Sequence, residues 1–271
     1  MSVRTLQSPK PYSATVLADR VLKESPRPQA TLAKYQAVWA VAQASGFSAP
    51  AVTRVFEGGV EMERLKGIRS LRGPFLAYQR GSSHDLFAQA GEALGRLHAG
   101  LPAAGPAWAA PMEFETALRR YGWAEDWRAL PTATLHGDYS FSNVQVMPDG
   151  GLAVIDPCPN HASTFEVWET GPIYVDIGKF LSCLEGQVPP LQMLQTSPVR
   201  NGRLQEIFLK AYEEATESPL DRAAAHAFAY AAAAVQFRRR GKLRGAIKTS
   251  TLYNRLRRNF PLPVKLRALA A

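Results

Sequence analysis

The segment that most constrains this chain is residues 135–157, which read LHGDYSFSNVQVMPDGGLAVIDP. It carries His136, Asp138 and Asn143 in an H-x-D-x-x-x-x-N arrangement, and Asp156 follows after a further apolar stretch. Phosphoryl transfer needs a carboxylate that orients and deprotonates an attacking hydroxyl, and two oxygen ligands that hold Mg²⁺ against the nucleotide phosphates. The spacing fits that requirement. We therefore expect Asp138 to be the catalytic carboxylate, and Asn143 and Asp156 to be the Mg²⁺ ligands.

Within this segment the sequence predicts a β-hairpin. Residues 143–147 and 152–155 form the two arms, and the PDGG sequence at 148–151 is a turn signal. A hairpin brings the chain back to the end from which it started. Asn143 and Asp156 are therefore expected at the same end, where one metal ion can bridge them.

The motifs HGDYSFSN and VIDP resemble the aminoglycoside phosphotransferase (APH)/choline kinase-like family, which has a protein-kinase-like fold. Two other stretches support this. GEALGRLH at residues 91–98 resembles the helix before the family's catalytic loop, and EMERLKG at 61–67 resembles its hinge between lobes. The resemblance covers residues 23–176, approximately, and its specific part is the combination of HGDxxxxN with IDP.

The resemblance implies an α+β, two-lobed fold. Residues 1–66 are expected to form a small, β-rich, nucleotide-binding lobe, with the hinge at 61–67. Residues 67–271 are expected to form a larger, mainly helical lobe with the catalytic loop, the metal site and the acceptor pocket. Short apolar runs predict strands at 3–6, 14–17, 20–23, 52–56 and 60–64, and helical spacing predicts helices at 31–45, 83–98, 203–217 and 219–240.

The N-terminal lobe contains one candidate phosphate ligand and one departure from the family. Lys23 ends the apolar run VLK and resembles the kinase lysine that steadies the nucleotide phosphates. In the family, the following helix carries a glutamate that pairs with this lysine, but no acidic residue lies between Ser25 and Glu57. Gln36 is the best-placed polar residue in the predicted helix. We therefore expect Gln36 to stand in for the glutamate.

A second departure concerns the loop that covers the phosphates in many kinase-like folds. That loop is usually rich in glycine, whereas this chain has no glycine before Gly46. Residues 8–13 occupy its expected place. After the second hairpin, backbone groups at about 61–64 are expected to face the adenine, which makes Glu61 and Glu63 the predicted nucleotide-contacting positions.

The region after the metal ligands is expected to shape the acceptor pocket. Residues 157–171 are the predicted acceptor-side loop, with His161, Glu166 and Glu169 as possible substrate contacts. Asp176 resembles the family's second aspartate, which braces the catalytic loop. Trp123 and Trp127 either pack on the lobe or line the acceptor pocket.

The composition limits the class of protein and the partners. The 271 residues are 46% hydrophobic and contain no apolar run long enough to span a membrane. Cys158 and Cys183 form neither a metal-binding spacing nor a disulfide framework, so a cytoplasmic setting is expected. The net charge is +9, and residues 238–267 contain eleven Lys/Arg and no acidic residue. Such a run attracts anions or is simply a solvated face, and no nucleic-acid-binding motif accompanies it.

The combined interpretation is a phosphotransferase that moves the γ-phosphoryl group of ATP or GTP to a hydroxyl of a small molecule. The basic C-terminal third favours a neutral or anionic acceptor, such as a sugar. Two alternatives stay open: a nucleotide-binding pseudokinase that acts as a scaffold, and an aminoglycoside-modifying resistance kinase. The expected partners are the nucleotide with Mg²⁺ and the acceptor, and the oligomeric state is left open.

Overall fold

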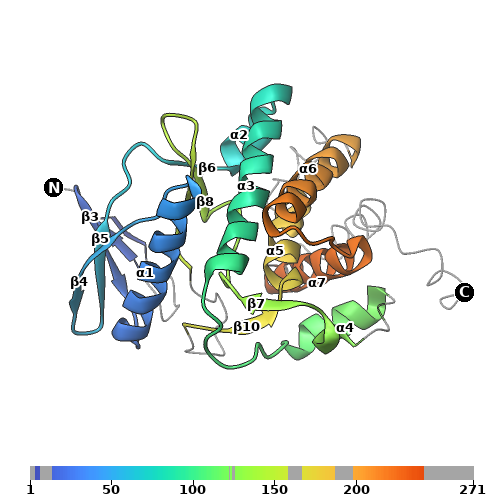
Figure 1. Cartoon of the computed structure of the whole chain (residues 1–271), viewed down its shortest axis with the longest axis horizontal. Coiled ribbons are helices and arrows are strands. Elements are labelled where there is room, and N and C mark those ends of the chain that lie inside the picture. Colours follow the sequence, from blue (N-terminus) through green and yellow to red (C-terminus); the bar gives the residue numbers. More distant parts are fainter. Residues whose placement is uncertain are drawn as a thin grey trace, which may run out of the picture.

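The structure, a computed structural model, describes residues 4–6, 14–121, 123, 126–157, 167–186 and 198–240 (Figure 1). A small sheet and one helix lie at the left of Figure 1, and the other helices lie at the right. This division into a β-rich part and a mainly helical part confirms the predicted α+β fold class. Residues 8–13, the predicted position of a phosphate-covering loop, and residues 241–271 lie outside the described residues.

The N-terminal sheet has five antiparallel strands. They are β1 (Arg4–Leu6), β2 (Ala14–Val16), β3 (Arg20–Glu24), β4 (Val52–Phe56) and β5 (Gly59–Glu63), in the spatial order β1-β2-β3-β5-β4. Their bounds lie within one or two residues of the predicted strands, because short β-branched runs separated by turn residues mark strands well. The strand β5 is internal, since it pairs with β3 on one side and β4 on the other.

Helix α1 (Pro28–Ser45) packs on this sheet and begins one turn earlier than predicted, because Pro28 is tolerated in the first turn of a helix. It ends where predicted. Gly46 adopts φ 78° and its backbone N–H donates to the Ala42 carbonyl, which is the usual left-handed helix stop. Tyr35 packs with Val60 and Met62 in a small core between the helix and the sheet.

The connection to the larger lobe joins the predicted catalytic hairpin, at residues 143–155, directly. Strand β6 (Arg69–Ser70) pairs with β8 (Val144–Val146), which pairs with β9 (Leu152–Val154). The segment after α1 also reaches this hairpin, since the Ser48 backbone N–H donates to the Leu152 carbonyl and the Ser48 carbonyl accepts from Val154. Both lobes therefore attach to the same short sheet.

The larger lobe is mainly helical. Its helices are α2 (Arg72–Ala77), α3 (Arg80–Gly100), α4 (Met112–Tyr121), α5 (Tyr174–Gly186), α6 (Pro198–Thr216) and α7 (Arg222–Arg240), with a two-stranded sheet of β7 (Thr132–Thr134) and β10 (Thr170–Pro172). The predicted helix at 219–240 begins later, because the Asp221 side chain accepts the backbone N–H groups of Ala223 and Ala224. None of the described helices is both long enough and apolar enough to cross a membrane.

Close contacts between helix backbones fix the packing of this lobe. A Cβ on Gly91 of α3 would lie 2.1 Å from the Phe208 carbonyl oxygen of α6. A Cβ on Gly178 of α5 would lie 2.6 Å from the backbone of Phe228 in α7. Phe180 of α5 stacks on Phe208 with ring centroids 4.2 Å apart. These contacts leave α5 little freedom to shift or rotate.

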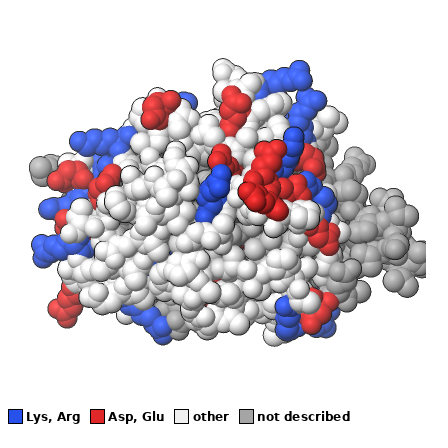
Figure 2. Space-filling view, in the orientation of Figure 1, with Lys and Arg blue, Asp and Glu red and all other residues white. Residues whose placement is uncertain are grey.

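The surface in Figure 2 carries basic and acidic side chains side by side. Of the eleven cations at 238–267, three precede residue 241, so eight (11 − 3) lie beyond α7. The positive excess predicted for the C-terminus is therefore mainly a property of residues outside the described part of the chain.

Candidate functional site

The catalytic hairpin has the predicted geometry. Val144 pairs with Val154, and the Asn143 carbonyl accepts the backbone N–H of Ile155 at 2.9 Å. This register places Asn143 and Asp156 at the same end of β8 and β9. Asp156 has φ 56°, which is uncommon for a residue other than glycine and marks a special position at the end of the strand.

Asp138 lies next to Asn143 and is nearly buried. The Asn143 side-chain Nδ2 donates to the Asp138 carbonyl at 2.9 Å and to its carboxylate Oδ2 at 3.2 Å. The other carboxylate oxygen, Oδ1, lies 3.0 Å from the Lys179 Nζ of α5. Sequence reasoning missed Lys179, although its place three residues after Asp176 in a predicted motif was visible in the sequence.

Asp176 braces the backbone of the catalytic loop. Its completely buried carboxylate accepts the backbone N–H groups of His136 at 2.7 Å and Gly137 at 3.0 Å, and it lies 3.2 Å from the His98 Nε2 of α3. Burial opposes ionisation of Asp176, but the hydrogen bonds from His98 and Gly137 and the electrostatic influence of His98 and His136 outweigh it and lower the pKa of Asp176. This arrangement matches the bracing role expected from the sequence.

His136 is a structural member of the loop. Its Nε2 lies 3.2 Å from the Ile155 carbonyl, and its Nδ1 accepts the Asp138 backbone N–H at 3.3 Å. Complete burial is the largest influence on this ring and lowers the pKa of His136 to about 4. The imidazole is therefore neutral near pH 7 and links the loop to the end of β9.

Lys23 lies on β3, and its buried Nζ forms an ion pair with the Asp156 carboxylate. The structure thus brings the predicted phosphate ligand to the predicted metal ligand. It does not bring Gln36 there, because that side chain is exposed on the outer face of α1. The expectation that Gln36 replaces the family's glutamate is corrected: Asp156 itself pairs with Lys23.

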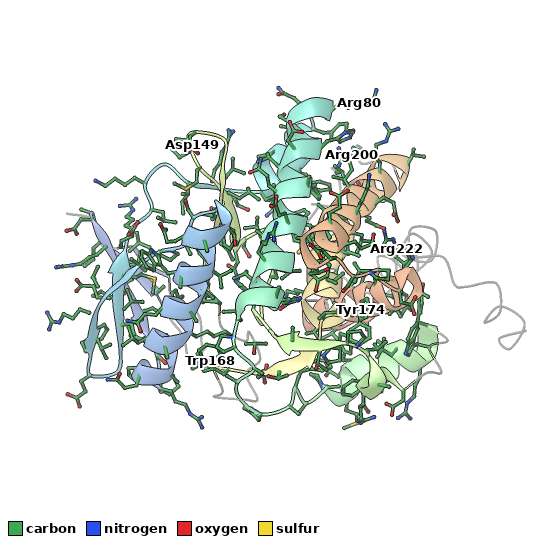
Figure 3. The ribbon with its side chains drawn as sticks, viewed as in Figure 1. Arg80, Asp149, Trp168, Tyr174, Arg200 and Arg222 are labelled. Carbon is green, nitrogen blue, oxygen red and sulfur yellow. The ribbon has the colours of Figure 1, made fainter. Side chains whose placement is uncertain are left out.

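Helix α1 contributes a different residue to the site. Lys34 is completely buried, and its Nζ donates to the Val167 carbonyl at 2.7 Å and the His136 carbonyl at 3.3 Å. Its ammonium also lies 5.9 Å from the ring of Trp168, which is seen near the lower end of α1 in Figure 3 and donates to the Ala30 carbonyl. The signal in the sequence was a lysine four residues before the apolar Val38, and therefore on the same side of the helix.

The structure also corrects the predicted nucleotide contacts at Glu61 and Glu63. Both lie in β5, whose backbone is paired on both sides. The Glu61 side chain lies beside Arg20 and Thr53, and Glu63 is exposed. After β5, the Arg64 backbone N–H still donates to the Asp19 carbonyl at 3.3 Å, so the chain leaves the sheet only at residues 65–67.

The predicted acceptor-side loop, residues 157–171, is described only in part. His161 and Glu166 lie outside the described residues. Glu169 is buried, with only 4% of its surface exposed, and its carbonyl accepts the Leu135 backbone N–H at 2.9 Å. The described part of this loop is therefore hydrogen-bonded to the residue just before His136.

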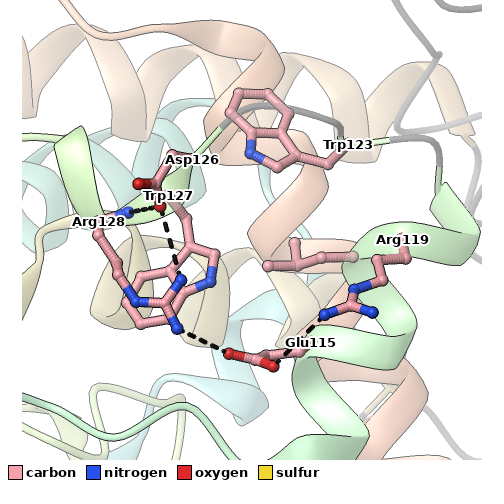
Figure 4. Close-up of a pocket in the computed structure, with 7 residues that line it drawn as sticks. Glu115, Arg119, Trp123, Asp126, Trp127 and Arg128 are labelled. Atoms are coloured by element: carbon pink, nitrogen blue, oxygen red, sulfur yellow. Dashed lines mark hydrogen bonds and ion pairs between the residues drawn. The ribbon is translucent and has the colours of Figure 1, made fainter.

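A separate cavity of about 300 Å³ lies beside α4 (Figure 4). Trp123 and Trp127 both line it, and Trp127 also packs against the buried Trp108, so these aromatics pack on the lobe and border a cavity at once. Glu115 forms one ion pair along α4 with Arg119 and another with Arg128, which lies after the helix. Among the described residues, Asn143, Lys179 and Lys23, which contact Asp138 or Asp156, do not line it.

The residues at the hairpin end fit a magnesium ion. The described part of the chain holds no group of three or more His, Cys, Asp or Glu side chains that could form a complete metal cage. Mg²⁺ in phosphoryl-transfer sites is held by only one or two protein oxygens together with phosphates and water. The Asn143 Nδ2 donates its hydrogen bonds to Asp138. The Asn143 amide oxygen is therefore the atom that can act as a ligand beside the Asp156 carboxylate.

No family model and no curated protein matches this chain, but solved structures do. A choline/ethanolamine kinase family protein from Mesorhizobium loti is 16% identical, with a TM-score of 0.55 over 100% of this chain and 92% of the other. A glucosamine kinase in complex with glucosamine, ADP and inorganic phosphate is 18% identical, with a TM-score of 0.63 over 99% and 82%. An aminoglycoside phosphotransferase from Streptomyces rimosus with ADP and streptomycin is 14% identical, with a TM-score of 0.50 over 86% and 92%. The chain therefore has the protein-kinase-like fold of the choline kinase and aminoglycoside phosphotransferase structures.

Proposed function

We propose that this protein is a phosphotransferase that moves the γ-phosphoryl group of ATP or GTP to a hydroxyl of a small molecule. The observation that carries the proposal is the meeting of Asp138, Asn143 and Asp156 at one end of the catalytic hairpin, with Lys23 paired to Asp156. A fold without catalytic activity has little need of all four groups together.

The roles follow from the chemistry of each group. Asp138 orients the acceptor hydroxyl and accepts its proton. The Asn143 amide oxygen and the Asp156 carboxylate hold Mg²⁺, which when bound neutralises charge on the β- and γ-phosphates. Lys23 holds the phosphates from the N-terminal lobe. Positioning and electrostatic stabilisation of this kind supply most of the catalysis in phosphoryl transfer.

The lack of a helix glutamate does not count against activity. That glutamate is expected to keep the lysine in place, and here the Asp156 carboxylate holds Lys23 before a nucleotide arrives. With Mg²⁺ and a nucleotide bound, Asp156 would be a ligand of the metal and Lys23 would hold the phosphates. The adenine or guanine base is assigned to the backbone at residues 65–67. The preceding residue, Arg64, is held by its backbone N–H on the Asp19 carbonyl and by its side chain on the Leu17 carbonyl at 2.9 Å.

The acceptor is proposed to be small and to carry a free hydroxyl. The similar structures were solved with glucosamine or streptomycin, which are both hydroxyl-rich. The preference for a neutral or anionic acceptor stays a prediction from the basic C-terminus. The protein is proposed to work in the cytoplasm.

A screen of nucleotide consumption tests the proposal. ATP and GTP are each supplied with Mg²⁺ and a panel of sugars, amino sugars, choline and aminoglycosides. With the acceptor that is found, Asp138→Ala should lower turnover by about 10²-fold or more and leave nucleotide affinity nearly intact. Nucleotide binding without transfer to any acceptor would favour the scaffold, and equal turnover by Asp138→Ala and the parent would remove Asp138 from the chemistry.

A further inference from the structure

One face of α5 contacts three consecutive residues of the catalytic loop. Asp176 accepts the backbone N–H groups of His136 and Gly137, and Lys179 contacts the side chain of Asp138. Asp176 and Lys179 are three residues apart, so they lie one above the other on the same side of the helix. Helix α5 therefore contacts the loop at two places. Asp176 binds the backbone of the loop, and Lys179 binds the side chain of Asp138.

The contact with Lys179 completes the restraint of the Asp138 carboxylate. Asn143 holds Oδ2 at 3.2 Å and Lys179 holds Oδ1 at 3.0 Å. Rotation about the last bond of an aspartate side chain has a broad energy minimum, so a single hydrogen bond restrains it poorly. A hydrogen-bond donor on one oxygen and a positive charge beside the other restrain the plane of the carboxylate from both sides.

The environment of the pair strengthens this restraint. The side chains of Lys179 and Asp138 are 25% and 11% exposed, respectively, so water screens their attraction less than at the open surface. The backbone of Lys179 is also held rigidly. Its neighbour Gly178 lies against the backbone of Phe228, and its other neighbour Phe180 stacks on Phe208.

We propose that Lys179 is a positioning residue that acts through Asp138. It fixes the carboxylate in the plane in which an oxygen can meet the acceptor hydroxyl. The inference rests on the proposed function, because Asp138 must be the group that orients the acceptor. Misplacement of a reacting group by about 1 Å can lower a rate by about 10²-fold, so a loose Asp138 has a measurable cost.

The first test compares Lys179→Met, Lys179→Arg and the matched control Lys210→Met. Lys210 pairs with Glu214 on the exposed face of α6, far along the chain from the loop. With Mg·ATP and glucosamine as the probe acceptor, and hydrolysis by water measured in parallel, Lys179→Met should lower kcat by about 10- to 100-fold. The KM for Mg·ATP should change less than about threefold, Lys179→Arg should recover part of kcat, and Lys210→Met should match the parent.

A double-mutant cycle then separates positioning from direct action on the phosphoryl group. If Lys179 acts through Asp138, adding Lys179→Met to Asp138→Asn should change kcat less than about twofold, because the group that it positions is already lost. If the two substitutions instead lower kcat by factors that multiply in the double variant, the proposal is overturned and Lys179 acts on the phosphoryl group itself. An unchanged kcat in the single Lys179→Met variant would overturn it as well.

A readout without turnover keeps this inference distinct from the proposed function. The same cycle is measured on the thermal unfolding midpoint of the ligand-free protein, where the two substitutions should not be additive. Additive shifts would overturn the positioning contact even in an active enzyme. A parent that shows coupled unfolding but consumes no nucleotide with glucosamine, water or any other acceptor would overturn the proposed function instead.

Discussion

The replacement Asp176→Asn tests whether one buried carboxylate holds the catalytic loop. The side chain is completely buried and lies within hydrogen-bonding distance of three donors, the backbone N–H groups of His136 and Gly137 and the ring of His98. Asparagine has nearly the same shape but only one acceptor oxygen. Its NH₂ group must therefore face at least one of these donors.

The expected loss of stability follows from these contacts. A hydrogen bond to a charged group contributes about 1.5–3 kcal/mol, and a buried donor left without an acceptor costs about 1–3 kcal/mol. If Asp176→Asn loses one charge-assisted bond and leaves one N–H unsatisfied, the free energy of unfolding should fall by about 2.5–6 kcal/mol. That is a large share of the total of about 5–15 kcal/mol that is typical of folded proteins.

Urea unfolding followed by tryptophan fluorescence measures this loss, since Trp108, Trp123 and Trp127 all lie in the larger lobe. The midpoint should fall without a change in the slope. The matched control is Asp85→Asn, at an exposed position of α3, with an expected change under about 0.5 kcal/mol. A loss for Asp176→Asn no larger than that of the control would refute the bracing role.

The same carboxylate gives a pH dependence with a defined sign. The pKa of Asp176 is lower in the folded protein than its usual value. Its contribution to stability is therefore complete above about pH 4 and is lost as the pH falls through the lower pKa of the folded state. Asp176→Asn should remove this part of the acid sensitivity.

Three further predictions concern the metal, the loop histidine and the C-terminus. Calorimetry with Mg·ATP should show that Asp156→Ala weakens nucleotide binding more than Asn143→Ala, since only Asp156 carries charge; unchanged affinity for Asp156→Ala would place the metal elsewhere. Because the pKa of His136 is lowered to about 4, the folded state resists protonation. Stability should therefore decline as the pH falls from about 6.5 to 4, by about 3 kcal/mol from this group, and a flat urea midpoint across that range would contradict its burial. If the acceptor is anionic, neutralising the three arginines at 238–240 should raise its KM and flatten the salt dependence of KM, whereas efficient transfer to aminoglycosides at low salt would exclude a positive acceptor pocket.

The hairpin and its three motif residues could be predicted from the sequence because they depend on local geometry. Strand alternation and the turn at 148–151 set the register, and the register places Asn143 and Asp156 at one end. The helix stop at Gly46 and the strand that carries Lys23 follow from equally short patterns. The fold class was implied by the resemblance of these motifs to the family, and the structure confirms it.

Predictions from sequence spacing were wrong for residues whose surroundings depend on how other helices and strands pack. Glu61 and Glu63 were expected at the hinge, but the pairing of β5 with both β3 and β4 puts them inside the sheet. Gln36 was expected to face Lys23, but the rotation of α1 on the sheet turns Lys34 inward and leaves Gln36 in solvent. A helix pattern shows which residues share a face, while the packing partner decides what that face meets.

The sequence by itself determined the catalytic motif, since its residues fall within one hairpin and the loop before it. Only the tertiary structure decided what holds that motif: Lys23 on Asp156, Lys34 on the loop backbone, and Lys179 on Asp138. The physical reason is that a local motif is specified by backbone geometry over a few residues. A contact between distant segments depends on how helices and strands pack, and the close approach of Gly178 to Phe228, which holds α5 and Lys179 against the loop, has no signature in spacing.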